Sequence, residues 1–543
     1  MRKTILVYLI GVLILAFAVV KGTYVFADDG VRRHHQHQER PSEADLGECL
    51  HCDENVLCTH LPLIVIDTFG QTIPGRPLAF GTGRYSDLET LENFHTGPNG
   101  ETEIEVSVLV IDNHESWNHE HDIPLHESMA TMRIRGNSSR FFDKPNFRIQ
   151  LIDEHGFNNP LPLLGMGEHH EWALHGPFLD KTLMRNYMWM NVAADVMGPG
   201  HFVPEVRFFE LILNGEFQGL YVLMETIRIS PDRVSLNNYR EGMPVTSYLM
   251  RLDSNYRTPE RNIGTFADYT YRLEMGRQME ILYPRIDNQS EAIQHYVATS
   301  ISITERLLYS PEMIWYPRLY EQYIDVNSFI NYFIINEFII NNDLWANSTY
   351  IHKDVRSHRI VAGPVWDFNN IMDNFFLETP YSEFYLVERG WFDRLMMCPS
   401  FTDRVIRRYN YLRRDGGALS EARLINYQQE VADWLGSAVE RNFEVWGYSF
   451  DPTQVSIMAR RLATRSDAEA RVYRHEGMSP EEFDAAVEIA RYEILREVNP
   501  QNFEAAMEHH RDFTIARGRW LDRHIETIRQ FSHPSRHALW TLQ

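Results

Sequence analysis

Residues 341–369, NNDLWANSTYIHKDVRSHRIVAGPVWDFN, form the most informative segment of the chain. Within it, residues 348–352 and 359–365 are strand-like runs that contain Thr, Tyr, Ile and Val. The polar run between them holds Asp and Ser, which favour turns. Two strands joined by such a turn predict a β-hairpin that folds the stretch back on itself.

Three polar side chains flank this hairpin. Asp343 and Asn347 precede its first strand and Asp367 follows its second, so we expect all three at one mouth of the hairpin. An Asp, Asn and Asp gathered in this way can hold Mg²⁺ and a nucleotide phosphate, in the order used by kinase-type phosphoryl transfer. The spacing alone leaves the alternative open that these residues cap turns in an ordinary loop.

The composition of the chain limits the class of protein to which it can belong. The chain of 543 residues can bury a large core and fold as two or more units. Its 44% hydrophobic and 12% aromatic content is that of a globular protein. A formal net charge of −23 argues against nucleic acid as a partner, because non-specific binding needs clustered Lys and Arg. A protein substrate is compatible with this charge.

The N-terminus has the pattern of an export signal. Arg2 and Lys3 precede an apolar run at residues 5–20, and Ala27 offers a small residue at a cleavage position. Residues 1–27 are predicted to be a cleaved signal peptide, with a retained membrane anchor as the alternative. We therefore expect a secreted or cell-surface protein that meets the membrane only through this segment.

Residues 28–60 are predicted to be a polar, solvated linker that contains cysteine. Three cysteines fall within ten residues: Cys49, Cys52 and Cys58. His51 or His60 would complete the four ligands of a zinc site. A local disulfide is the alternative outside the cytosol, and the pairing cannot be derived from the sequence.

The fold class is predicted to be α+β. Residues 61–255 are predicted to be a β-rich, antiparallel part that carries one helix at 180–197, with a hairpin turn at Asn214 and Gly215. Residues 256–543 are predicted to be helical and to contain the Asp343–Asp367 hairpin. The helices expected there lie at 289–310, 327–340, 391–414, 420–446, 454–465, 480–497 and 500–531.

A second polar site is predicted in the β-rich part. Lys144 and Arg148 share the polar face of a strand, next to the small-residue loop 136–140. The loop can offer backbone N–H groups to phosphate and Lys144 can add charge. A plain hairpin with a basic face is the alternative.

Four segments together resemble the CotH (spore coat protein H) kinase family of atypical protein kinases. They are MRIRGNSSRFFDKPNFRIQL at 132–151, DKTLMRNYMW at 180–189, LNGEFQGLYVLMETI at 213–227, and NEFIINNDLWANSTYIHKD through PVWDFN at 336–369. The resemblance implies a two-lobe, kinase-like fold that uses ATP with Mg²⁺ or Mn²⁺. It implies phosphorylation of Ser or Thr on secreted, surface or coat proteins, with a spore-coat location and autophosphorylation as possibilities.

The resemblance also implies roles for residues. Asp343 matches the catalytic Asp that accepts the hydroxyl proton, and Asn347 and Asp367 match the metal ligands. Lys144 takes the place of the phosphate-holding lysine. Further residues would contact nucleotide: Arg135, Ser138, Ser139 and Arg140 at the phosphates, and Met224 and Glu225 at adenine. Arg185 and Asn186 are a family signature expected to brace the site.

Two departures from the family pattern are visible. Asn369 stands where many members have Asp, which weakens a second metal site unless Asp373 compensates. Lys144 has no obvious acidic partner, although Asp180 or Glu171 is a candidate. The alternatives to a kinase are an inactive assembly protein on the same fold and another ATP-dependent transfer, such as nucleotidylation.

Overall fold

The computed structural model describes residues 33–50, 56–78, 94–136, 138–253, 261–266, 279–311, 313, 316, 318–374, 379–455, 467–475 and 477–537. The predicted signal peptide at 1–27 lies outside the described residues, as does most of the helix expected at 454–465. Within the described ranges, no helix has both the length and the apolar character required to cross a lipid bilayer.

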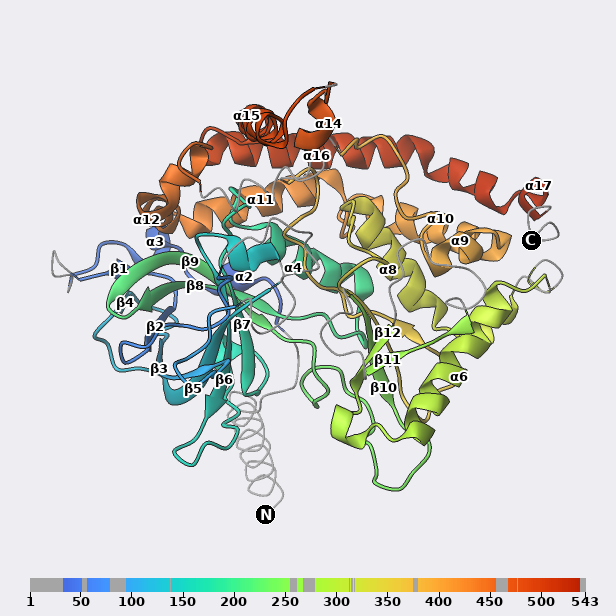
Figure 1. Cartoon of the computed structure of the whole chain (residues 1–543), viewed down its shortest axis with the longest axis horizontal. Coiled ribbons are helices and arrows are strands. Elements are labelled where there is room, and N and C mark those ends of the chain that lie inside the picture. Colours follow the sequence, from blue (N-terminus) through green and yellow to red (C-terminus); the bar gives the residue numbers. More distant parts are fainter. Residues whose placement is uncertain are drawn as a thin grey trace, which may run out of the picture. The chain divides into compact units, whose positions relative to one another are not determined.

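Seven strands form a closed barrel in the order β2–β3–β5–β6–β7–β9–β8 (Figure 1). They are β2 Leu63–Asp67, β3 Ile104–Ile111, β5 His126–Arg135, β6 Asn146–Ile152, β7 Glu171–His175, β8 Val206–Leu213 and β9 Glu216–Glu225. Neighbours are antiparallel except β2 and β8, which are parallel with Leu63 opposite Glu210. The prediction of an antiparallel sheet is corrected here, because an odd number of alternating strands closes only through one parallel pair.

Alternating apolar residues build the interior of the barrel. On β6, Phe147, Ile149 and Leu151 alternate with polar residues along the sequence, and all three are buried in the barrel core. Each such side chain contributes about 1.5–3 kcal/mol on full burial. Between β8 and β9, Asn214 and Gly215 have φ of 55° and 77°, which is the left-handed backbone that a type I′ hairpin turn requires.

A second, five-stranded sheet has the order β11–β12–β10–β13–β14. Its strands are β10 Tyr248–Leu252, β11 Asn262–Ile263, β12 Met279–Tyr283, β13 Thr349–Lys353 and β14 Val361–Ala362. The predicted hairpin is confirmed as β13 and β14, with Ile351 opposite Ala362. The sheet takes strands from both sides of residue 255, where the sequence had placed the end of the β-rich part.

The remaining chain is mostly helical. The described helices of this part are α4 Arg185–Met197, α6 Glu291–Leu308, α8 Val326–Phe338, α9 Trp391–Met396, α10 Pro399–Arg413, α11 Glu421–Leu435, α12 Ser437–Trp446, α14 Asp467–Arg471, α15 Pro480–Val498, α16 Phe503–His524 and α17 Pro534–His537. Two predicted helices are each divided. Pro399 starts α10 after α9, because proline suits the first turn of a helix. Gly436, with φ of 49°, separates α11 from α12.

Helix α8 carries the chain into the hairpin. Its residues are apolar on nearly all sides and are buried except for Asn327, and the helix contacts α4, α10, α16 and β14. Asp325 caps its N-terminus by accepting a hydrogen bond from the Ser328 N–H at 2.8 Å. The surrounding helices and β14 therefore fix the point at which the following loop begins.

The segment before the barrel is structured where it is described. It contains α2 Gln36–Glu39 and α3 Glu43–Leu46, and a two-stranded sheet pairs β1 Cys58–Thr59 with β4 Asn118–His119. Gln36 is buried, and its side-chain amide accepts from the Phe208 N–H at 2.7 Å and donates to the Phe208 carbonyl at 3.2 Å. This part of the expected solvated linker therefore packs onto β8.

Candidate active site

The loop after α8 places Asp343 and Asn347 side by side. The Asp343 carbonyl accepts the N–H groups of Ala346 at 2.9 Å and Asn347 at 2.6 Å, which closes one tight turn. Across that turn, the Asn347 side-chain nitrogen donates to Asp343 Oδ1 at 3.0 Å. The amide therefore fixes the orientation of the carboxylate.

Asp367 joins them from the other end of the hairpin. The Ser348 hydroxyl, next to β13, donates to Asp367 Oδ2 at 3.3 Å. The negative charge of Asp343 acts on Asp367, which requires the two carboxylates to be near each other. The structure thus brings together Asp343, Asn347 and Asp367, as the sequence predicted.

The backbone of this mouth is strained. Trp345, Ser348 and Asp367 have φ of 61°, 46° and 67°, and such left-handed backbone costs about 1–3 kcal/mol for a residue other than glycine. Packing maintains it, since the Trp345 ring lies 5.5 Å from that of Trp391 and the backbone N–H of Trp345 donates to Thr349 Oγ1 at 2.8 Å. Strain concentrated at one polar cluster is typical of functional sites.

The surroundings of Asp367 disfavour its negative charge unless a cation is bound nearby. Burial and then the charge of Asp343 raise its pKa to about 6, against the opposing charge of Arg135. Asp253 adds a further negative charge. A proton or a metal ion at this position would relieve the repulsion.

Asp253 is the residue that sequence reasoning missed. It directly follows β10, and β10 pairs with β13 so that Leu252 lies opposite Thr349. Continuing that register places Asp253 across from Ser348, at the hairpin mouth. The sequence of residues 248–253 has the pattern of a short strand, but it holds no signal for which strand would be its neighbour.

Arg135 is the cation that the barrel supplies to this site. It ends β5, and its guanidinium carbon lies 5.4 Å from the centre of the Trp366 ring. Burial lowers the pKa of Arg135, and the charge of Asp367 opposes this shift. Of the predicted phosphate-contacting residues, Arg135 is therefore brought next to the carboxylates.

The loop that follows Arg135 is held by its own side chains. Gly136 has φ of 112°, and a Cβ at this position would collide with Ser139 Oγ. Arg140 Nε donates to the Gly136 carbonyl at 2.7 Å, and Ser138 begins a 3-10 turn that ends at Phe141. The side chain of Ser138 lies outside the described part of the structure.

Lys144 is placed elsewhere, which corrects the expected polar face. It is only 1% exposed, and its ammonium donates to the Leu220 carbonyl at 2.6 Å and to Asn442 Oδ1 at 2.7 Å. Burial and then the charge of Lys181 lower its pKa well below the ordinary value. The negative charge of Glu210 opposes this shift. Its bonds tie β9 to α12.

The expected partners of Lys144 are also engaged elsewhere. Asp180 pairs with Arg185 at 2.5 Å, where both side chains are buried. Glu171 pairs with Arg148 at 2.6 Å and with Arg228 at 2.8 Å. A lysine–glutamate pair of the ordinary kinase type is therefore not formed by these residues.

Met224 and Glu225 lie inside the barrel wall. Met224 is opposite Ala173 on one side and Val206 on the other. The Glu225 N–H donates to the Glu205 carbonyl at 3.1 Å. The backbone of these residues takes part in strand pairing, and the expected contact with adenine stays a prediction.

Asn186 braces the site in the way the family signature suggested. Its side-chain oxygen is buried and accepts the Phe368 N–H at 2.8 Å, directly after Asp367. Asp180 fixes the start of the same helix, because its Oδ2 accepts the Arg185 N–H at 2.8 Å. Helix α4 thereby holds the backbone that presents Asp367.

The donor set suits a hard divalent cation. Asp367 and Asn347 offer carboxylate and amide oxygens, the ligand types that Mg²⁺ prefers. Asn369 Oδ1 and Asn370 Oδ1 are buried and accept no hydrogen bond from the described residues. Asp373, by contrast, accepts the Thr379 N–H at 3.0 Å and lies 3.5 Å from His509 Nε2. Asn369 thus has a side-chain oxygen available as a ligand, whereas Asp373 already has partners.

Comparison with known proteins identifies the family. A family model described as CotH kinase protein matches residues 132–521 of the 543-residue chain. The chain belongs to the CotH kinase family. No curated protein matches it. The range shared with the CotH family contains Arg135, the hairpin and most of α16, and the family name indicates kinase-like chemistry.

Proposed function

We propose that this CotH family protein transfers the γ-phosphoryl group of ATP to a protein hydroxyl. The observation that carries the proposal is the hairpin mouth. There Asp343, Asn347 and Asp367 lie together, and the positive charge of Arg135 acts on Asp367. Phosphoryl transfer needs positioning and charge neutralisation more than covalent chemistry, and these residue types supply both.

In this proposal Asp343 orients the acceptor hydroxyl and takes its proton. Its hydrogen bond from Asn347 keeps the carboxylate in one orientation. Asp367 and Asn347 would hold Mg²⁺ or Mn²⁺, with Asn369 as a further oxygen ligand. Bound metal and ATP would supply the phosphoryl group and neutralise charge that develops on it.

We propose that the nucleotide phosphates lie between β5 and the hairpin. Arg135 would face the phosphates, and the backbone of Ser138, Ser139 and Arg140 would add N–H donors. The barrel and the helical part would then act as the two lobes of a kinase-like fold. The contact between Arg135 and Trp366 supports this arrangement, since the two residues come from these two parts.

The acceptor is proposed to be Ser or Thr on a secreted, surface or coat protein, which includes the protein itself. Export through residues 1–27 would place the enzyme with such substrates. The net charge of −23 is compatible with a basic acceptor segment.

Intact-mass spectrometry after incubation with ATP and Mg²⁺ or Mn²⁺ tests the proposal. A phosphoryl adduct on the protein or on an added acceptor is expected, and a nucleotidyl adduct would indicate the alternative transfer, because each group has its own mass. Asp367→Ala should fold and lose more than ~10³ in rate. Asp512→Ala, on the exposed face of α16, serves as the matched control. Equal labelling by Asp367→Ala would refute the assignment.

Asn369 favours one alternative, an assembly protein that kept the fold and lost the chemistry. Its amide supplies an oxygen but no charge for a metal. Thermal unfolding with and without Mg-ATP separates the two functions. A ligand at 100 times its dissociation constant adds about 2.7 kcal/mol to stability. No shift at millimolar nucleotide would favour the assembly protein.

A further inference from the structure

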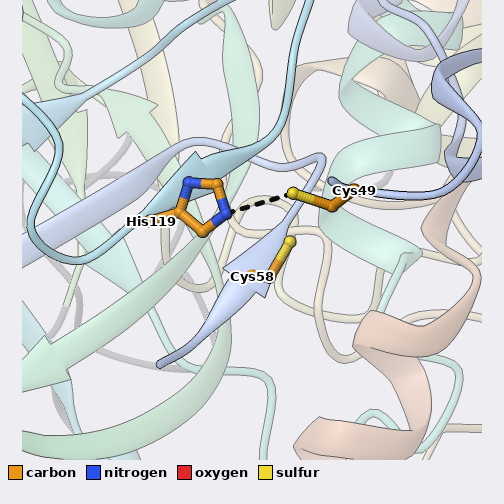
Figure 2. Close-up of side chains that lie close together, drawn as sticks. All are labelled: Cys49, Cys58 and His119. Atoms are coloured by element: carbon orange, nitrogen blue, oxygen red, sulfur yellow. Dashed lines mark hydrogen bonds between the residues drawn. The ribbon is translucent and has the colours of Figure 1, made fainter. Parts of the chain in front are cut away.

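Two cysteines and a histidine converge where β1 pairs with β4 (Figure 2). The sulfurs of Cys49 and Cys58 and a ring nitrogen of His119 all lie within 4.8 Å of one another. His119 Nε2 is 3.4 Å from Cys49 Sγ. All three side chains are half-buried, so an ion could reach them from solvent.

The pairing of two short strands creates this cluster. Cys58 in β1 lies opposite His119 in β4. Arg441 holds β1, because it donates to Thr59 Oγ1 at 3.1 Å while both its Nε and Nη2 donate to Glu210 at 2.9 Å. The backbone thus fixes a sulfur and an imidazole next to each other.

The other nitrogen of the imidazole also has a carboxylate partner. His119 Nδ1 lies 3.3 Å from Asp122 Oδ2, and that oxygen also accepts the His119 backbone N–H at 2.9 Å. A histidine that binds zinc usually donates its second N–H to a carboxylate, which fixes the tautomer and turns the other nitrogen to the metal. Asp122 therefore presents Nε2 toward the sulfurs.

We propose that Cys49, Cys58 and His119 bind a zinc ion that is separate from the metal of the hairpin mouth. In a tetrahedral site with ordinary Zn–S and Zn–N distances, sulfur and nitrogen ligands lie about 3.6 Å apart, close to the separation found here. Thiolate and imidazole ligands select zinc, whereas Mg²⁺ requires oxygen. Binding releases the two thiol protons, so two thiolates neutralise Zn²⁺.

This ligand set differs from the one that the sequence suggested. His60 is buried 3.3 Å from Glu43 and packs edge-on against Trp434, so it is engaged on another side. His51 and Cys52 lie outside the described residues and are not part of the proposal. His119 comes from the connection between β3 and β5, about sixty residues later in the chain.

The proposed ion has a structural role. It would join the segment after α3 to β1 and to the β3–β5 connection, in a region with only two-residue strands. Metal binding to a site formed only in the folded chain stabilises the fold. Chelation is therefore expected to lower the midpoint of thermal unfolding without requiring any change in nucleotide binding.

Metal analysis of the purified full-length protein tests the proposal. We expect about one zinc per chain, and Cys58→Ser and His119→Ala should lose it. His121→Ala is the matched control, because that side chain is 77% exposed and pairs with Glu120. Asp122→Asn should retain the ligands but weaken zinc affinity about 10–100-fold.

A Co²⁺ readout on the wild-type protein does not depend on how the variants fold. Replacing zinc with Co²⁺ should give the thiolate charge-transfer and tetrahedral absorption bands of a mixed sulfur–nitrogen site. Under denaturing, non-reducing conditions, the protein should titrate as four thiols. A count of two, absence of the cobalt bands, or zinc retained by both ligand variants would overturn the proposal. None of these results bears on phosphoryl transfer.

Discussion

Lowering the pH from 7 to 5 is expected to weaken Mn²⁺ binding to the nucleotide-free protein about tenfold, because Asp367 titrates in this range. Burial and the neighbouring Asp343 raise its pKa from 3.8 to about 6. The carboxylate is then about nine-tenths ionised at pH 7 and about one-tenth ionised at pH 5. An Asp with the ordinary value would stay more than about nine-tenths ionised at pH 5, and its metal affinity would scarcely change.

Electron paramagnetic resonance of free Mn²⁺ at constant ionic strength measures this affinity directly. Nucleotide is left out because its phosphates titrate in the same range. Asp367→Asn should bind weakly at both pH values, without the tenfold change. Arg135→Gln should move the transition to higher pH, because the opposing positive charge is removed. An unchanged dissociation constant between pH 7 and pH 5 in the wild type would refute the reasoning.

Three further predictions concern single substitutions. Asp367 binds its proton more tightly in the folded protein than in the unfolded chain, so the free energy of unfolding should fall as the pH rises from 4 to 6. The fall is at most about 3 kcal/mol, and screening by solvent makes it smaller. Asp367→Asn should therefore raise the urea midpoint of the metal-free protein at pH 7, and no rise would contradict this. Lys144→Met should cost about 1.5–3 kcal/mol in urea unfolding but leave the KM for ATP unchanged, whereas Arg135→Met should raise that KM. The reverse pattern would restore Lys144 as the phosphate ligand. Asn186→Ala leaves the Phe368 N–H without its acceptor and should cost about 1–3 kcal/mol and lower kcat, as measured by urea unfolding and initial rates.

The hairpin mouth could be predicted from the sequence because its geometry is local. Asp343 and Asn347 are four residues apart in one turn, and a short hairpin must return the chain to Asp367. The Asn214–Gly215 turn and the alternating face of β6 are local in the same sense. Interactions between near neighbours depend on few other parts of the chain, so a sequence pattern is sufficient to place them.

Lys144 shows where a local pattern fails. Strand alternation placed it on a polar, outward face, but Asn442, 298 residues later, covers that face and accepts its hydrogen bond. Asp253 and the pair of Cys58 and His119 depend in the same way on which strands become neighbours. A strand pattern indicates which side chains face the core, but it does not indicate what will cover the other face.

The α+β class, the strand and helix periods, and the three polar residues of the hairpin follow from local sequence patterns. The folded chain was needed to show that the positive charge of Arg135 acts on Asp367, and that seven strands close through one parallel pair. These contacts join segments that are far apart in the chain. Their free energy depends on how the whole core packs, and no short window of residues contains that information.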